Sequence, residues 1–555
     1  MPPSRLAPSW GRSLSTQLMI ALGGILIVTF LLGSFAQSAE ITEEPDFGGA
    51  YIEGLAGFPQ SINPVLASDD ASNTLVSLLF DGLTRTDPQG RVIPNLAEKW
   101  ETSPDAREYT FHLRDGVRWH DGTPFSADDV IFTYGVLRDP SYSGPYGVQW
   151  RDVNVEKLDR LTVRLSLPKD IFAPFLEFTT VGILPSHILG AVGARDLPAH
   201  RFNIQPVGTG PYKLKELTPD RITLEANTSH TPSPWLARII FRIYPNYKTI
   251  LTALERDEVE GAPLVEPGDV VRFEHRKDVK IWDAPENTVT MLFMNTANPV
   301  LSDRLVRQAI TSAIDRGRVI RLARNGHARP ADGPILSSSW AYDSNVRRLE
   351  YNGAHARALL DEAGWTADPA GGPGRQKEGN PLRLVVLTND RPERLAVAGE
   401  VQRQLVAIGI DVEVQATGAG GLVQDFLLPR KFELAVFSWD FNGFDPDPYS
   451  LWHSTQVAPV GLNISGFSNR KADEALERGR RSLDQSERSK AYAEFQVIFA
   501  DEVPALPLYA PEYRYAISTK IRGVRTGIVA NPPDRFRNVT DWFAKTRREI
   551  ATRRS

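Results

Sequence analysis

The chain has 555 residues, of which 41 % are hydrophobic and 24 % charged, and its formal net charge is -5 at pH 7. A chain this long exceeds what one hydrophobic core supports, so two or three domains are expected, and the negative charge argues against a nucleic-acid partner. Cysteine is absent, which excludes disulfides, thiolate metal sites, a cysteine nucleophile and a lipid-modified cysteine.

The first 38 residues are predicted to direct export. Arg5 and Arg12 precede an apolar run over residues 18–35, and Ala36-Gln37-Ser38 is a small-residue cleavage pattern. The run is long for a signal peptide and just long enough to cross a bilayer. Residues 1–38 are therefore either a removed signal peptide or a retained membrane anchor, and the rest of the chain is expected outside the cytoplasm.

A strand followed by a helix is predicted between residues 96 and 137. Tyr109, Phe111 and Leu113 alternate with polar residues, as in a half-buried strand. Ser126 is expected to cap the following helix, because its hydroxyl can accept a hydrogen bond from a first-turn amide.

Metal binding and catalysis find little support in this stretch. His120, Asp121, Asp128 and Asp129 are potential ligands or acid-base groups, but turn and capping roles account for each of them. The chain also lacks the His-Glu-x-x-His, Gly-x-Ser-x-Gly and phosphate-loop motifs. We therefore expect no catalytic residue, no metal and no cofactor.

The second half of the chain predicts a parallel strand-helix-strand unit. Residues 382–387 and 410–414 have strand character, and the apolar stripe of residues 393–408 is helical. Residues 432–437 are expected as a further buried strand of the same sheet, with Ser438, Trp439, Asp440 and Asn442 directly after it. Carboxyl ends of strands in open α/β sheets are where small ligands bind.

A resemblance to a known family rests on several motifs. Residues 96–134, which read LAEKWETSPDAREYTFHLRDGVRWHDGTPFSADDVIFTY, closely resemble the signature of the family 5 extracytoplasmic solute-binding proteins of ABC importers, the peptide, nickel and opine group. The resemblance covers roughly residues 48–543. The other motifs follow in the expected order: SINP at 61–64, LFDGL at 79–83, VGTGPYKL at 207–214, VRQAITSAIDR at 306–316, LLDEAGW at 359–365 and PLY at 507–509.

The resemblance implies an α/β fold of the two-lobed periplasmic-binding-protein type II-like kind, with a hinge and an extra inserted domain. Two chain crossings, near Ala284-Pro285 and at Pro504 to Pro507, would form the hinge about which the lobes close on a ligand. The basic C-terminal tail is expected to be a solvated, frayed end. The implied division is 48–70, 190–285 and 505–543 for lobe I, 71–189 for the inserted domain, 290–500 for lobe II and 544–555 for the tail.

Ligand contacts are implied by the oligopeptide- and dipeptide-binding members of the family, in which an aspartate three residues beyond a tryptophan holds the α-amine of the peptide. Matched here, Trp439 is the tryptophan and Asn442 takes the place of the aspartate. An asparagine cannot supply the charge that a buried ammonium needs, whereas Asp440 lies on the same face of an extended chain as residue 442. The ligand-binding candidates are Ser438, Trp439, Asp440, Asn442, the loop tyrosines Tyr142 and Tyr146, and Asn295 at the end of the apolar run 291–294.

The implied function is that of a non-enzymatic receptor. It would capture oligopeptides or similar extended solutes outside the membrane, act as a monomer, and deliver them to the permease and ATPase subunits of an ABC importer. A nickel or metal-chelate receptor is an alternative, although nine histidines with no His-x-x-x-His pair give a direct metal site weak support. An exported hydrolase is the alternative of a different class, and it would need an activated nucleophile beside a base.

Overall fold

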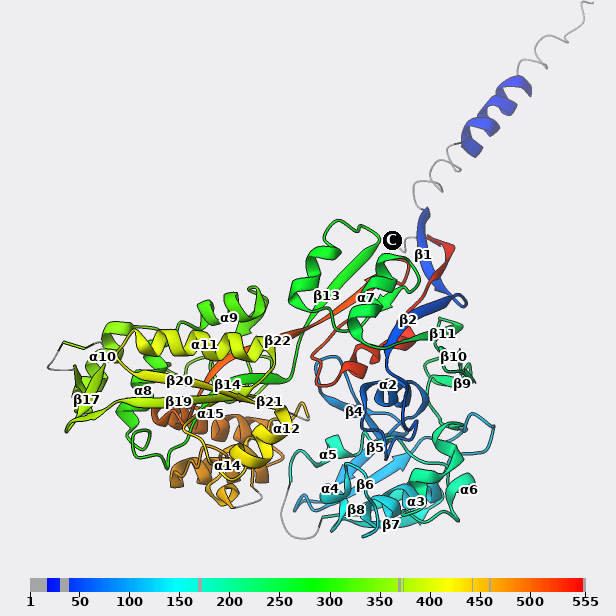
Figure 1. The fold of residues 1–555 in the computed structure, drawn as a ribbon. Coiled ribbons are helices and arrows are strands. Elements are labelled where there is room, and N and C mark those ends of the chain that lie inside the picture. Colours follow the sequence, from blue (N-terminus) through cyan, green and yellow to red (C-terminus); the bar gives the residue numbers. More distant parts are fainter. Residues whose placement is uncertain are drawn as a thin grey trace, which may run out of the picture.

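One strand, β22 (Ala505–Ser518), runs from one half of the molecule into the other (Figure 1). In the computed structural model, which describes residues 17–29, 39–167, 172–367, 371–372, 374–441, 443–458 and 461–552, its first residues pair antiparallel with β14 (Thr288–Met294). Its later residues pair antiparallel with β13 (Val279–Pro285). Since β13 and β14 follow each other directly, two adjacent chain crossings join the two lobes.

These crossings set the boundary between the lobes. Residues 505–509 pair with β14 and so lie in the sheet of the second lobe, although the expected division gives 505–543 to the first lobe. The chain passes between the lobes near Pro511, which pairs with β15 (Ala328–Pro330) and whose carbonyl accepts the amide of Glu286. Both crossings therefore meet at one place, as a hinge requires.

The second lobe contains the predicted parallel unit. β19 (Arg383–Asn389) and β20 (Asp411–Thr417) are parallel, and α11 (Pro392–Val406) connects them with Val397, Val401 and Leu405 buried, so this prediction is confirmed. β21 (Leu434–Asp440) lies parallel to β19 and antiparallel to β14. It is longer than expected, because Ser438, Trp439 and Asp440 are its last residues and do not follow it.

Helices cover both faces of this sheet, as the amphipathic patterns require. α11 and α9 lie together on one face and α14 and α15 on the other (Figure 1). Asn469 and Asp484 cap α14 and α15 through their side-chain oxygens. Besides α11, the main helices of the second lobe are α8 (Arg304–Ala313), α9 (Arg316–Arg324), α10 (Gly353–Glu362), α14 (Arg470–Arg481) and α15 (Gln485–Glu502).

The first lobe is built on the other end of the same sheet. Its core contains a fully buried ion pair between Glu53 and Arg535, whose Nε donates to Glu53 Oε1 at 3.0 Å. Tyr51 and Tyr515 both donate to the second carboxylate oxygen, so the buried charge is fully hydrogen-bonded. The elements of this lobe are β2 (Ala50–Ala56), β9 (Tyr212–Leu217), β10 (Arg221–Ala226), β11 (Arg238–Tyr244), α7 (Tyr247–Glu255) and β12 (Gly261–Ala262).

An inserted domain follows β2 in the chain and lies next to the first lobe (Figure 1). Tyr109, Phe111 and Leu113 are buried, which confirms the predicted alternation. Ser126 caps the next helix, and Asp129 completes a capping box by accepting the Ser126 amide at 3.0 Å. The principal elements are α2 (Asp70–Leu79), β3 (Thr84–Thr86), β4 (Val92–Pro94), β5 (Ala97–Thr102), β6 (Glu108–Leu113), α3 (Ala127–Arg138), β7 (Asn154–Asp159), β8 (Thr162–Ser166) and α5 (Phe175–Phe178).

The segment that follows residue 38 pairs with the C-terminal segment. β1 (Ala39–Asp46) and β23 (Lys545–Thr552) form an antiparallel two-stranded sheet, so most of the basic tail is a strand and not the frayed end that was expected. Residues 17–29 are helical. Across the residues that the structure describes, no helix combines the length and the apolar character needed to cross a bilayer. The predicted cleavage pattern at residues 36–38 lies outside them.

Candidate functional site

Two neighbouring cavities lie where the inserted domain faces the second lobe, with volumes of about 600 and 760 Å³. Both volumes are in the range of small-molecule binding sites. Pro174 and Glu177 of the inserted domain and Asp445 of the second lobe line both cavities. The segment Gly443–Asp445, here called the crossbar, therefore separates them.

The larger cavity has aromatic walls. Trp439 lines it from the second lobe, where the indole is half-buried and makes an edge contact with Phe437, with 6.5 Å between ring centres. Phe172 and Phe178 of the inserted domain, whose stacked rings are 5.6 Å apart, line the opposite side. Aromatic surfaces on both lobes give an apolar ligand contact area from two sides.

Asp440 supplies an acid to this cavity. Its carboxylate is exposed, lines the cavity and accepts a hydrogen bond from Thr288 Oγ1 at 2.6 Å. Among the residues that the structure describes, no lysine, arginine or histidine forms an ion pair with it. Asp440 is thus free to bind a cation. Asn442 lies outside the described residues.

The Ser438 hydroxyl is engaged in hydrogen bonds within the second lobe. Its hydroxyl lies 2.7 Å from Thr290 Oγ1 and also accepts from the guanidinium of Arg394 on α11. Arg394 in turn donates to Thr290 Oγ1 at 2.9 Å. Alternation along β21 places Ser438 on the face opposite Trp439, so the structure does not bring these two side chains together.

Asn295 lies at the opposite end of the β14–β21 pair from Trp439. Its side-chain amide donates to the carbonyls of Arg430 at 3.0 Å and Phe432 at 2.8 Å. The residue is buried and lines neither cavity. Its contacts tie a strand end to the segment before β21, which is a structural role.

The two loop tyrosines pack inside the inserted domain. Tyr142 donates its phenol hydrogen to the carbonyl of Val65 at 2.5 Å. Tyr142 and Tyr146 are half-buried against the core of this domain and line neither cavity. Burial raises the pKa of the Tyr146 phenol, as expected for a ring away from water.

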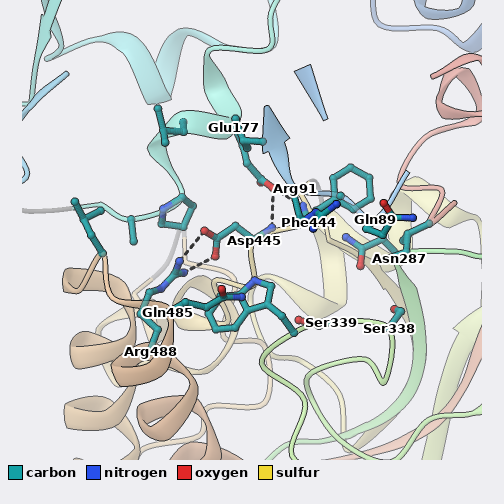
Figure 2. A pocket seen from close by; sticks show the side chains of 18 of the residues that line it. Gln89, Arg91, Glu177, Asn287, Ser338, Ser339, Phe444, Asp445, Gln485 and Arg488 are labelled. Carbon is teal, nitrogen blue, oxygen red and sulfur yellow. Dashed lines mark hydrogen bonds and ion pairs between the residues drawn. The ribbon is translucent and has the colours of Figure 1, made fainter. Parts of the chain in front are cut away.

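Glu177 is the site residue that the sequence analysis missed. One of its oxygens, Oε1, accepts the backbone amides of Phe444 and Asp445, each at 2.7 Å, as Figure 2 shows for Asp445. Burial and the nearby charge of Asp445 raise the pKa of the Glu177 carboxyl to about 8. The sequence gives little sign of this role, because Glu177 is a single acid within the apolar turn FLEF.

The other charges around the crossbar are paired. Arg488 of α15 donates to Asp445 Oδ2 at 2.7 Å, and Arg480 of α14 donates to Asp447 at 2.9 Å. The Arg480 guanidinium also lies over the rings of Phe172 and Tyr449, at 4.8 and 4.3 Å. In the part of the chain that is described, no cluster of three or more histidine, aspartate or glutamate side chains could hold a metal ion. The aromatic walls and the Asp440 carboxylate of the larger cavity suit a ligand with apolar and cationic groups.

The chain matches known proteins over most of its length. The family model for bacterial extracellular solute-binding proteins, family 5 Middle, matches residues 91–458. The oligopeptide-binding protein AppA of Bacillus subtilis is 30 % identical over 511 residues, which cover 90 % of this chain and 92 % of that protein.

Solved structures of similar proteins share the fold. The structure of Bacillus subtilis AppA in complex with a nonapeptide has a TM-score of 0.69 and 29 % identity, covering 90 % of this chain and 99 % of that one. NikZ of Campylobacter jejuni in complex with Ni(L-His) has a TM-score of 0.71 and 26 % identity, covering 89 % of this chain and 99 % of that one. Similar two-lobed proteins thus bind peptides in one case and a metal chelate in another.

Proposed function

Because the chain belongs to family 5 of the bacterial extracellular solute-binding proteins, we propose that it is the substrate-binding component of an ABC importer. It captures peptides or similar extended solutes in the space between its lobes and delivers them to the permease. The crossings at Glu286–Asn287 and near Pro511 act as the hinge.

One observation supports a peptide as the ligand. The cavity that Trp439 lines contains Asp440, a carboxylate with a hydroxyl partner and no cationic partner among the described residues. A peptide with a free α-amine brings both the charge that this carboxylate needs and the apolar side chains that the aromatic walls accept. The similarity to an oligopeptide-binding protein supports the same ligand class.

A metal-chelate receptor is the second candidate, because NikZ binds Ni(L-His) and shares the fold. In such a receptor the chelator would supply most of the metal ligands, so the protein would need few of its own. We expect either receptor to be a monomer outside the cytoplasm, exported through residues 1–38 as a removed signal or a retained anchor, and to work with permease and ATPase subunits.

Co-purification tests this function. The purified protein is incubated with a mixture of peptides and separated by gel filtration, and the molecules that remain bound are identified by mass spectrometry. Intact peptides in the protein fraction are the expected result. A bound metal complex without peptide would favour the second candidate, and cleaved peptides would indicate a hydrolase.

A further inference from the structure

The inserted domain hydrogen-bonds to the crossbar through the side chain of Glu177. Glu177 Oε1 accepts the amides of Phe444 and Asp445, both at 2.7 Å. At Gly443 a Cβ atom would collide with Glu177 Oε2, so the crossbar reaches the carboxyl group because this residue has no side chain. Glu177 therefore contacts the second lobe over both of its oxygens, and these contacts exist only when the lobes are together.

Closure places this carboxyl group beside the carboxylate of Asp445, and the charge of Arg488 offsets this only in part. Asp445 of the crossbar carries a second carboxylate, and its partner Arg488 of α15 is engaged in that ion pair. Asp447 is likewise paired with Arg480 of α14. Among the described residues, Glu177 itself has no cationic partner within ion-pair distance. The carboxyl group is half-buried at the contact between the lobes, and its partial removal from water, next to a second carboxylate, favours the protonated form.

The remaining charged groups around the crossbar do not change this conclusion. Arg91, which lines the smaller cavity next to β4, donates to Asp87 at 2.7 Å. Arg537 of the first lobe lies over the Phe444 ring with its guanidinium carbon 4.3 Å from the ring centre. Both cations thus have partners other than Glu177.

Burial and the charge of Asp445 raise the pKa of Glu177, and the two amide hydrogen bonds to Oε1, which favour the ionised carboxylate, offset this only in part. When the lobes separate, water reaches the group and its pKa returns to the ordinary value of about 4.3. At neutral pH the carboxyl group is then ionised in the open protein and protonated in the closed one.

We propose that Glu177 couples closure of the two lobes, and so ligand capture, to the uptake of a proton. This inference rests on the proposed function, because closure is what retains the ligand. It makes Glu177 a positioning residue that joins the lobes at the boundary between the two cavities.

The pH dependence follows from the direction of the shift. Burial, together with the charge of Asp445, raises the pKa of Glu177 to about 8 in the closed protein, above its open-state value. Protonation therefore favours closure fully below the open-state pKa, and this contribution is lost as pH rises through 8. The apparent affinity is expected to fall about tenfold from pH 6 to pH 7 and to level off above about pH 9.

Calorimetric titration between pH 6 and pH 7 tests the proposal with a synthetic peptide of a sequence recovered by co-purification. In this range the peptide amine stays protonated, because its pKa is about 8. Titrations at about pH 6.5 in two buffers of different ionisation enthalpy should reveal uptake of about one proton per bound peptide. Glu177→Gln, which keeps the accepting oxygen and removes the titration, should show neither the uptake nor the loss of affinity.

Glu98→Gln is the matched control, because Glu98 is an exposed glutamate of the same inserted domain that lines neither cavity. This variant should keep the pH dependence of the unmodified protein. If the affinity of the unmodified protein does not change with pH and no proton is taken up, the inference is overturned while the receptor function stands. The same holds if the affinity of Glu177→Gln depends on pH as strongly as that of the unmodified protein. Failure of any peptide to bind at either pH would instead reject the proposed function, and the inference with it.

Discussion

The guanidinium carbon of Arg537 lies 4.3 Å from the centre of the Phe444 ring. Arg537 follows the 3-10 helix Pro532–Phe536 of the first lobe, and Phe444 belongs to the crossbar of the second. The same ring packs against Gly90, where a Cβ atom would collide with it. Phe444 therefore reaches across the cleft, next to the amide hydrogen bonds that Glu177 accepts.

Phe444→Ala is expected to weaken ligand binding by favouring the open protein. A cation–π contact contributes about 0.5–2 kcal/mol, and loss of the ring also exposes apolar surface, so the affinity should fall about tenfold. Calorimetry with a bound peptide measures this change. Phe58→Ala, at a phenylalanine that is 46 % exposed, is the control and should bind normally. Equal affinities for the two variants would show that Phe444 does not stabilise the closed protein.

Trp439→Ala should reduce affinity and leave the protein folded. The indole lines the larger cavity and is half-buried, so its removal takes contact area from the ligand. Trp452→Ala is a matched comparison, because Trp452 is fully buried between Phe293 and Phe499 and should cost about 3–5 kcal/mol of stability. Chemical denaturation and calorimetry on both variants separate the two effects. A large loss of stability for Trp439→Ala, with unchanged affinity per folded molecule, would mean that Trp439 is a core residue.

Asp440→Asn should weaken binding of peptides with a free amine by one to two powers of ten, since a hydrogen bond to a charged group contributes about 1.5–3 kcal/mol. N-acetylated peptides carry no ammonium group and should bind both forms alike. Titration of each variant with matched free and acetylated peptides measures the difference. If the substitution affects both peptides equally, Asp440 does not bind the amine.

Asn295→Ala should lower stability and spare affinity. Its amide satisfies two buried carbonyls at the far end of β14, and leaving them without partners costs about 1–3 kcal/mol. Urea denaturation measures the loss. A reduced affinity per folded molecule, with unchanged stability, would return Asn295 to the ligand site.

Local features of the fold were predictable from sequence. The unit of β19, α11 and β20 follows from periodicity within the chain segments themselves, and Ser126 needs only its own helix to act as a cap. The pairing of β1 with β23 was not predictable, because it joins segments that lie far apart in the chain and the basic residues of β23 are also typical of a solvated tail.

The site was predictable only in part. Trp439 and Asp440 were predicted from the apolar run before them. Trp439 also matches a family motif, whereas Asp440 was inferred from the alternation of an extended chain. Asn295 was misleading, since an amide at the end of a strand looks the same in sequence whether it faces a ligand or buried carbonyls. Glu177 was missed because its partners Phe444 and Asp445 lie in another lobe, and no local pattern encodes such a contact.

The central claim is that this protein captures intact peptides with a free amine between its lobes. Calorimetric titration of the unmodified protein with a recovered peptide, followed by mass spectrometry of the complex, tests it most directly. We predict saturation at one peptide per chain, recovery of the peptide uncleaved, and weaker binding after N-acetylation. No saturable binding by the folded protein, or recovery of cleaved peptide, would contradict the account.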